Sequence, residues 1–205
     1  MESVASLLSR PGLAGADRVL VGALAEVFPG RFDRLQEWAR AARDLGVPRD
    51  AVAEILLQSV LFCGFPRTIS AFEALAAAWP GAAPAEAQTT PAAERIARGD
   101  ALFASIYGGI TEAVHTMLRR HHPELHDFVI ESAYGRILSR TGLSTRLREL
   151  AGTAALAASD QIPQMVGHAR GAMRHGATPL EVAEAVHTAI GDPVATAALV
   201  RRIRL

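Results

Sequence analysis

A carboxylate and an imidazole within residues 146–176 have the types and the spacing of a proton-transfer pair. Ala and Leu recur there at helical spacing, which predicts a helical hairpin that turns at Ser159 and Asp160. Glu149 lies ten residues before Ser159, and His168 lies eight residues after Asp160. At about 1.5 Å of rise per residue, both side chains sit roughly 12 to 15 Å from the turn, at a similar level of the hairpin. Because the unperturbed pKa of histidine is near neutrality, this pair could act as a general acid and base.

The ends of the two arms support the hairpin. We expect the first arm over residues 144–158, beginning with a serine cap, and the second over residues 162–175. Gly176 then supplies a left-handed stop. A structural interpretation of the two polar residues stays open: His168 can be a core histidine bonded to a backbone carbonyl, and Glu149 a solvated helix residue.

Composition limits the class of protein. The chain has 205 residues, half of them hydrophobic, and a formal net charge of zero, which suffices for one large or two small domains and argues against a nucleic-acid partner. Its first residues lack the features of a signal peptide, and no apolar run is expected to reach the length of a membrane span. We therefore expect a cytoplasmic protein with neither nucleic-acid nor membrane partners.

Missing residue types exclude several kinds of chemistry. The sequence contains no lysine, so it can form no Schiff base and has no lysine-bearing phosphate loop. Its single cysteine, Cys63, excludes an internal disulfide and a CxxC redox pair. No glycine-rich dinucleotide fingerprint follows a strand pattern. We expect no cofactor.

The hydrophobic pattern predicts an all-α fold. Val, Ile and Thr never dominate a run with alternating polarity, whereas helical spacing continues throughout the chain. Pro and Gly residues then divide the chain into segments. Besides the hairpin, helices are expected over residues 17–27, 32–45, 48–62, 66–79, 92–107, 111–120, 123–139 and 178–190, with a last helix after Pro193.

The two halves of the chain repeat each other. Residues 44–54 match residues 174–184 at an offset of 130, sharing a Gly, a Pro-containing helix start and Val-Ala-Glu. The same offset sets Trp38 against His168, so an indole would fill the position of the imidazole in the first copy.

The repeat defines the expected domain organisation. Residues 1–79 form a first repeat with a degenerate site, residues 80–91 a Pro- and Ala-rich linker, and residues 92–205 a second repeat with the candidate site. An offset near 131 would set Arg18 against Glu149.

Residues 54–66, 128–150 and 168–184 resemble the carboxymuconolactone decarboxylase and alkylhydroperoxidase D-like family. The resemblance covers most of the chain in a two-repeat arrangement, and it implies an all-helical fold built on the hairpin that assembles into rings. The peroxidase branch has a glutamate, a CxxC pair and a histidine within one repeat. Glu149 and His168 fall on the glutamate and histidine positions, but two glutamines replace the cysteines, which indicates the cofactor-independent decarboxylase branch.

The resemblance and the residue types together predict an enzyme acting on a small lactone or carboxylic acid. His168 is expected to be the general acid and base, with Glu149 as its orienting or proton-relay partner. Expected substrate-binding residues are Gln161 and Gln164, at the cysteine positions, together with Arg148 and His187. Arg148 alternatively forms a surface ion pair.

Two other functions remain open. The chain can be a catalytically degenerate oligomeric scaffold or binding module, or a peroxidase that uses Cys63. Glu184 and His187 have the spacing of a metal-binding helix, but a second such motif is missing and no metal is expected. A solvated loop is expected to carry His121, His122 and His126. Large Leu and Ala faces favour a homo-oligomer, a trimer if single-repeat relatives form hexamers.

Overall fold

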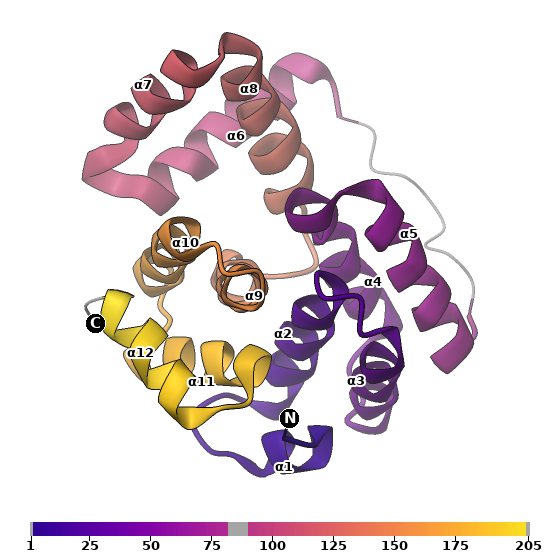
Figure 1. Cartoon of the computed structure of the whole chain (residues 1–205). Helices are drawn as coiled ribbons and strands as arrows, with labels where there is room; N and C mark the ends of the chain where they lie inside the picture. The colour runs from indigo at the N-terminus through magenta and orange to yellow at the C-terminus, as the bar shows by residue number, and fades with distance from the viewer. Residues whose placement is uncertain (1, 82–89, 204–205) are drawn as a thin grey trace.

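The computed structural model describes residues 2–81 and 90–203, which contain helices and no strand (Figure 1). The all-α prediction is confirmed. Residues 82–89, most of the expected linker, lie outside the described residues. The helical elements are, in order, α1 (Val4–Ser9), α2 (Gly15–Val27), α3 (Phe32–Asp44), α4 (Arg49–Gln58), α5 (Val60–Ala78), α6 (Ala92–Tyr107), η1 (Gly108–Ile110), α7 (Thr111–His121), α8 (Pro123–Phe128), η2 (Val129–Leu138), α9 (Thr145–Ala158), α10 (Ile162–Arg174), α11 (Pro179–Ile190) and α12 (Pro193–Ile203).

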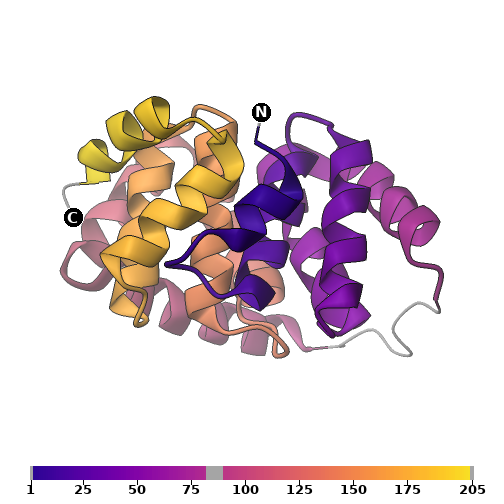
Figure 2. The same cartoon turned by 90° about the horizontal axis from the view of Figure 1, so that it is seen from below.

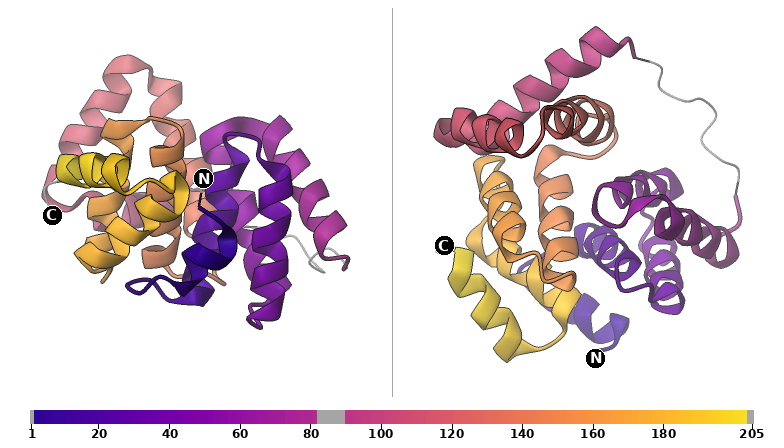
Figure 3. Two further views of the ribbon diagram at one scale, coloured as in Figure 1. Left: turned by 60° about the horizontal axis from the view of Figure 1, so that its bottom comes forward. Right: turned by 45° about the horizontal axis from the view of Figure 1, so that its top comes forward.

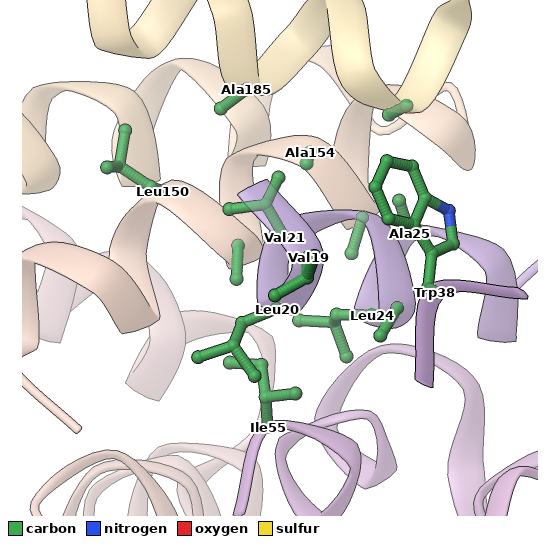
Figure 4. Close-up of a cluster of buried hydrophobic side chains, with 14 of the residues drawn as sticks. Val19, Leu20, Val21, Leu24, Ala25, Trp38, Ile55, Leu150, Ala154 and Ala185 are labelled. Carbon is green, nitrogen blue, oxygen red and sulfur yellow. The ribbon is translucent and has the colours of Figure 1, made fainter. Parts of the chain in front are cut away.

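Helix α9 lies at the centre of the molecule and packs against α2, α10 and α11 (Figures 1 and 3). Buried apolar side chains from both halves meet around it, among them Leu24, Ile55, Leu150, Ala154 and Ala185 (Figure 4). Helix α9 is buried on almost every side, which explains its run of small and apolar residues. The two halves therefore share one hydrophobic core.

Three of the predicted helix boundaries are confirmed, whereas the expected helices over residues 48–62 and 66–79 are instead Arg49–Gln58 and Val60–Ala78. The backbone N–H of Leu147 donates to Oγ of Ser144, at 3.2 Å, at the start of α9. A complete capping box joins Thr178 and Glu181 at the start of α11. Gly176 has a φ of +94°, so the second arm of the hairpin stops where the glycine predicts.

The expected helix over residues 123–139 is instead a short α-helix, α8, followed by the π-helix η2. At this point η2 crosses α6 so closely that backbone touches backbone. A Cβ on Gly135 would lie 2.1 Å from the carbonyl oxygen of Arg95, and one on Gly99 would lie 2.2 Å from that of Ile130. π-turns are rare and hydropathy alone does not mark them, so the sequence pattern missed this one.

Helix α5 corrects the expectation that no apolar run is as long as a membrane span. Its 19 residues, Val60–Ala78, reach that length with a mean hydropathy of 1.3. However, Gly64 has a φ of +70° and Pro66 follows it, so the helix is bent near its start. The rest of α5 packs against α3 and α4.

The helix order supports the proposed repeat. Helices α2, α3 and α4 begin at residues 15, 32 and 49, and α9, α10 and α11 begin at residues 145, 162 and 179, so each pair is separated by 130 residues. The expected offset of 131 for Arg18 is therefore wrong, because α2 and α9 contain no shift in register. Arg18 corresponds to Arg148, and Val19 corresponds to Glu149.

Two arginine–glutamate clusters join the halves reciprocally. In one, Arg140 and Arg148 bind Glu54, with closest N–O distances of 2.6 and 3.0 Å. In the other, Arg10 and Arg18 bind Glu184, at 2.7 and 3.0 Å.

Each member of one cluster lies 130 residues from its counterpart in the other. In both clusters the arginines of one half bind the glutamate of the other half. This reciprocity supports an approximate two-fold relation between residues 1–79 and 92–205, which remains our proposal for the domain organisation.

The contact of η2 with α6 predicts that Gly135→Ala destabilises the fold. The added methyl group would overlap the Arg95 carbonyl, and separating the two helices should lower the free energy of unfolding by about 1–3 kcal/mol. Urea denaturation measures the change. Gly109→Ala is the matched control, because nothing lies within 4 Å of its Cβ position. Equal stabilities of the two variants would contradict the close crossing.

Candidate functional site

The predicted pair converges between the two arms of the hairpin. Nδ1 of His168 on α10 lies 3.0 Å from Oε2 of Glu149 on α9. The carboxylate side chain is 1% exposed, whereas the imidazole is 13% exposed. Within residues 2–81 and 90–203, no other residue donates a hydrogen bond to either oxygen of Glu149, and the contact with Nδ1 of His168 is short but poorly aligned. The carboxylate thus has a single positive partner, whose side chain is not completely buried.

Two glycines on facing helices make room for this pair. A Cβ on Gly152, one turn after Glu149, would lie 3.1 Å from Nδ1 of His168. A Cβ on Gly171, one turn after His168, would lie 2.5 Å from Oε2 of Glu149. Each glycine therefore lets the ionisable group of the opposite helix approach the backbone, and a larger residue at either position would separate the pair.

A side chain from the first half completes the apolar side of the site. The ring of Phe62 on α5 meets the imidazole of His168 edge to face, with centroids 5.9 Å apart and an interplanar angle of 71°. Its Cζ would also lie 3.3 Å from a Cβ on Gly152. The site therefore needs the packing of both halves and is not a property of the hairpin alone.

The charge of Glu149 outweighs the effect of burial on His168. Burial by itself lowers the pKa of the imidazole, because the charged form loses its hydration. The negative charge of Glu149 and its hydrogen bond act in the opposite direction, and the net pKa of His168 is raised. The imidazolium form is thus favoured at higher pH than in a free histidine, as a general acid requires.

Two tyrosines near the pair were missed by sequence reasoning. Tyr107 ends α6, and its Cε1 would lie 3.9 Å from a Cβ on Gly167, the residue before His168. Tyr134, on the π-helix η2, donates a hydrogen bond to the hydroxyl of Tyr107 at 3.2 Å. No spacing rule connects these residues to the hairpin, because they come from segments distant in the sequence. The glycines beside them, in Tyr107-Gly108-Gly109 and Tyr134-Gly135, were the only signal of close packing.

Arg148 is a correction to the expected substrate-binding set. It faces α4 rather than the imidazole, and its guanidinium is 1% exposed. Its NH groups donate to Glu54, to Gln58 and to the carbonyl of Arg140. These partners leave Arg148 inside the contact between the halves, neither at the surface nor free for a substrate.

His187, another expected substrate-binding residue, is bonded to side chains outside the Glu149–His168 site. Its Nδ1 lies 3.1 Å from Oγ1 of Thr196, and its Nε2 lies 2.9 Å from the carboxylate of Glu2. Figure 2 shows the N-terminal segment, which carries Glu2, lying beside α11. The two arginines bound to Glu184 likewise leave the Glu184–His187 motif with protein partners.

Gln161 and Gln164 are exposed near the start of α10. Gln164 lies one turn before His168 on the same helix, so its amide can extend toward the imidazole. Gln161 lies two turns before His168, and its amide donates weakly to the carbonyl of Ser159, at 3.4 Å. Their role in substrate binding stays a prediction.

The expected solvated histidine loop is correct only in part. His121 and His122 are exposed, and Nδ1 of His122 accepts the N–H of Glu124 at the start of α8. His126 is buried instead, with Nε2 2.8 Å from Nδ1 of His115 on α7. This pair of imidazoles joins α7 to α8, and the two histidines are the buried residues of those helices.

The comparisons with known proteins identify the family. Residues 123–200, which include the hairpin with Glu149 and His168, match the model of the carboxymuconolactone decarboxylase family. The chain is also 32% identical over 176 residues to Peroxisomal protein 2 of Schizosaccharomyces pombe, with 83% of each chain covered. The chain belongs to the carboxymuconolactone decarboxylase family. Tyr107 and Phe62 lie outside the segment that matches the family model.

The raised pKa of His168 predicts how this site affects stability. A group whose folded pKa is raised stabilises the fold fully below its unfolded pKa, about 6.5, and the contribution is lost as pH rises through the folded value. In Glu149→Gln the carboxylate charge is gone, and burial alone lowers the pKa of His168. Protonation of the buried imidazole at low pH should therefore destabilise the variant. Urea denaturation from about pH 5 to pH 9 measures the free energy of unfolding of both proteins. Subtracting the variant from the wild type at each pH removes the contributions of the other carboxylates, and the difference should fall as the pH rises. If this difference in the free energy of unfolding instead grew with rising pH, the pKa of His168 would not be raised by Glu149.

Proposed function

We propose that this member of the carboxymuconolactone decarboxylase family is a cofactor-independent enzyme that acts on a small lactone acid. The observation that carries the proposal is the buried carboxylate of Glu149, 3.0 Å from an imidazole that is partly exposed. Burying an ionisable pair costs free energy that an apolar pair would not, so a chain that only needed stability would gain little from it. A proton-transfer function explains why the pair is there.

The proposed reaction balances with residues of this chain alone. The substrate carboxylate leaves as carbon dioxide, and its bonding electrons move into the conjugated lactone carbonyl. The imidazolium of His168 then donates a proton to the carbon that lost the carboxylate. Solvent returns a proton to His168 through the exposed part of its ring, while Glu149 stays ionised and keeps the imidazole oriented. Isomerisation of a lactone would use the same pair.

Peroxidase chemistry with Cys63 has less support. Burial raises the pKa of its thiol, despite opposing hydrogen bonds, and a thiolate is the reactive form. The Sγ donates to the carbonyl of Ser59, at 3.1 Å. The CxxC positions of the peroxidase branch hold Gln161 and Gln164, so no second thiol is available to resolve an oxidised Cys63.

Location and assembly remain proposals. We keep the cytoplasmic location expected from the sequence, although the name of the Schizosaccharomyces pombe relative places that protein in the peroxisome. We also keep the homo-oligomer, a trimer of two-repeat chains. Exposed apolar residues such as Phe65, Phe128 and Val194, which are 65 to 77% exposed, are consistent with further association.

The proposal predicts that His168→Ala abolishes turnover at temperatures where the variant is still folded, which thermal unfolding checks because the buried Glu149 loses its positive partner. The assay supplies small lactone acids, including γ-carboxymuconolactone, and measures the release of carbon dioxide. Loss of the proton donor should lower kcat by at least about 100-fold.

His175→Gln, at the end of the same helix, and Cys63→Ser are the controls, and both should retain activity. Full activity of His168→Ala, loss of activity in Cys63→Ser, or no turnover of any lactone acid by the wild type would each overturn the proposed function.

A further inference from the structure

The end of α6 is fixed on α10 on both sides of His168. Before it, the ring of Tyr107 lies against Gly167, with Cε1 3.9 Å from the Cβ position of the glycine. After it, Cγ2 of Ile106 would lie 2.8 Å from a Cβ on Gly171. Arg174 also donates a hydrogen bond to the carbonyl of Ile106, at 2.6 Å. Tyr107 is therefore held against the backbone of α10, next to the residue before His168, by contacts that the π-helix does not supply.

The hydroxyl of Tyr107 has one hydrogen left to donate. Tyr134 is buried and donates its own hydroxyl hydrogen to Tyr107. Among residues 2–81 and 90–203, no group accepts the hydroxyl hydrogen of Tyr107 in return. Tyr107 is only half-buried, whereas Tyr134 is 4% exposed, so the spare donor is on the more accessible of the two rings.

Burial and the charge of Glu149 keep both hydroxyls protonated. Burial raises the pKa of Tyr107, and the charge of Glu149 adds to it against the opposing hydrogen bond from Tyr134. Burial raises the pKa of Tyr134 well above its ordinary value, and the charges of Tyr107 and Glu149 add to the effect. The charge of Glu149 affects the pKa of both tyrosines, which indicates that both hydroxyls lie near the carboxylate. Tyr107 is therefore a neutral hydrogen-bond donor at any physiological pH.

We propose that Tyr107 is a substrate-binding residue of the His168 site, where its hydroxyl donates a hydrogen bond to an oxygen of the lactone acid. This inference rests on the proposed function and adds a residue that the family match does not contain. The favoured acceptor is the lactone carbonyl oxygen, which gains negative charge when carbon dioxide leaves. A fixed donor there stabilises the charge while His168 delivers the proton. Tyr134 is a positioning residue, because it acts by orienting the hydroxyl of Tyr107.

The test compares Tyr107→Phe with wild type in two measurements. Calorimetric titration with γ-carboxy-γ-butyrolactone, a saturated lactone acid that cannot lose its carboxylate readily, measures binding. We expect about tenfold weaker binding in Tyr107→Phe, the size of one lost hydrogen bond to an anionic ligand. With a substrate that the wild type turns over, kcat should fall more than KM rises, because the donor matters most when the oxygen carries charge.

Two further variants separate this role from packing. Tyr134→Phe keeps both rings but frees the hydroxyl of Tyr107 to rotate, and it should weaken binding by about threefold. Ser105→Ala removes a different hydroxyl of α6, one that contacts the end of α10, since Oγ of Ser105 lies 3.2 Å from Nε2 of His175. It should bind the probe as the wild type does. Thermal unfolding of each variant checks that the fold is retained.

The outcomes distinguish the two proposals. Suppose that the wild type binds the probe and turns over a lactone acid. If Tyr107→Phe then does both equally well, the inference is overturned and the proposed function stands. Wild type that neither binds the probe nor turns over a lactone acid overturns the proposed function and the inference with it. A loss in Ser105→Ala as large as in Tyr107→Phe would assign the effect to helix packing, and would also overturn the inference.

Discussion

A carboxylate buried in the central helix needs a positive partner, and the imidazole of His168 is the one that the fold supplies. An isolated buried carboxylate would be too costly to keep ionised. The cost falls when a cation lies within hydrogen-bond distance, and it falls only if the two helices pack closely enough to bring the groups together. Gly152 and Gly171 permit that approach. The hairpin, its glycines and the ring of Phe62 together enclose the buried charge of Glu149.

The first half shows what the same scaffold looks like without this charge. At the offset of 130, Val19 stands where Glu149 stands, and Trp38 where His168 stands. The indole is fully buried and lies over Gly22, just as the imidazole lies beside the glycine 130 residues later. An apolar pair therefore fills the same space, with the arginine–glutamate clusters retained between the halves. This contrast supports a repeat in which one copy keeps the ionisable pair and the other does not.

Sequence reasoning succeeded where periodicity along one element decides the outcome. The rise of a helix placed Glu149 and His168 at one level of the hairpin, and capping chemistry located most helix ends. It failed where contacts between elements that are distant in the sequence decide the outcome. Arg148 directly precedes Glu149, yet a helix turns about 100° per residue, so the arginine points into the other half. Tyr107 could not be found, because it comes near the site through the packing of the end of α6 on α10, two helices that are distant in the sequence.

The charge of Glu149 raises the pKa of His168 despite the burial of the imidazole. Nuclear magnetic resonance of the ring nitrogens of His168, followed through a pH titration of the wild-type chain, tests it directly. The account predicts that both nitrogens remain protonated as the pH passes 6.5, the ordinary pKa of histidine, and that the ring titrates above this value. A ring that is already neutral at that pH would contradict the account, because burial would then have outweighed the carboxylate.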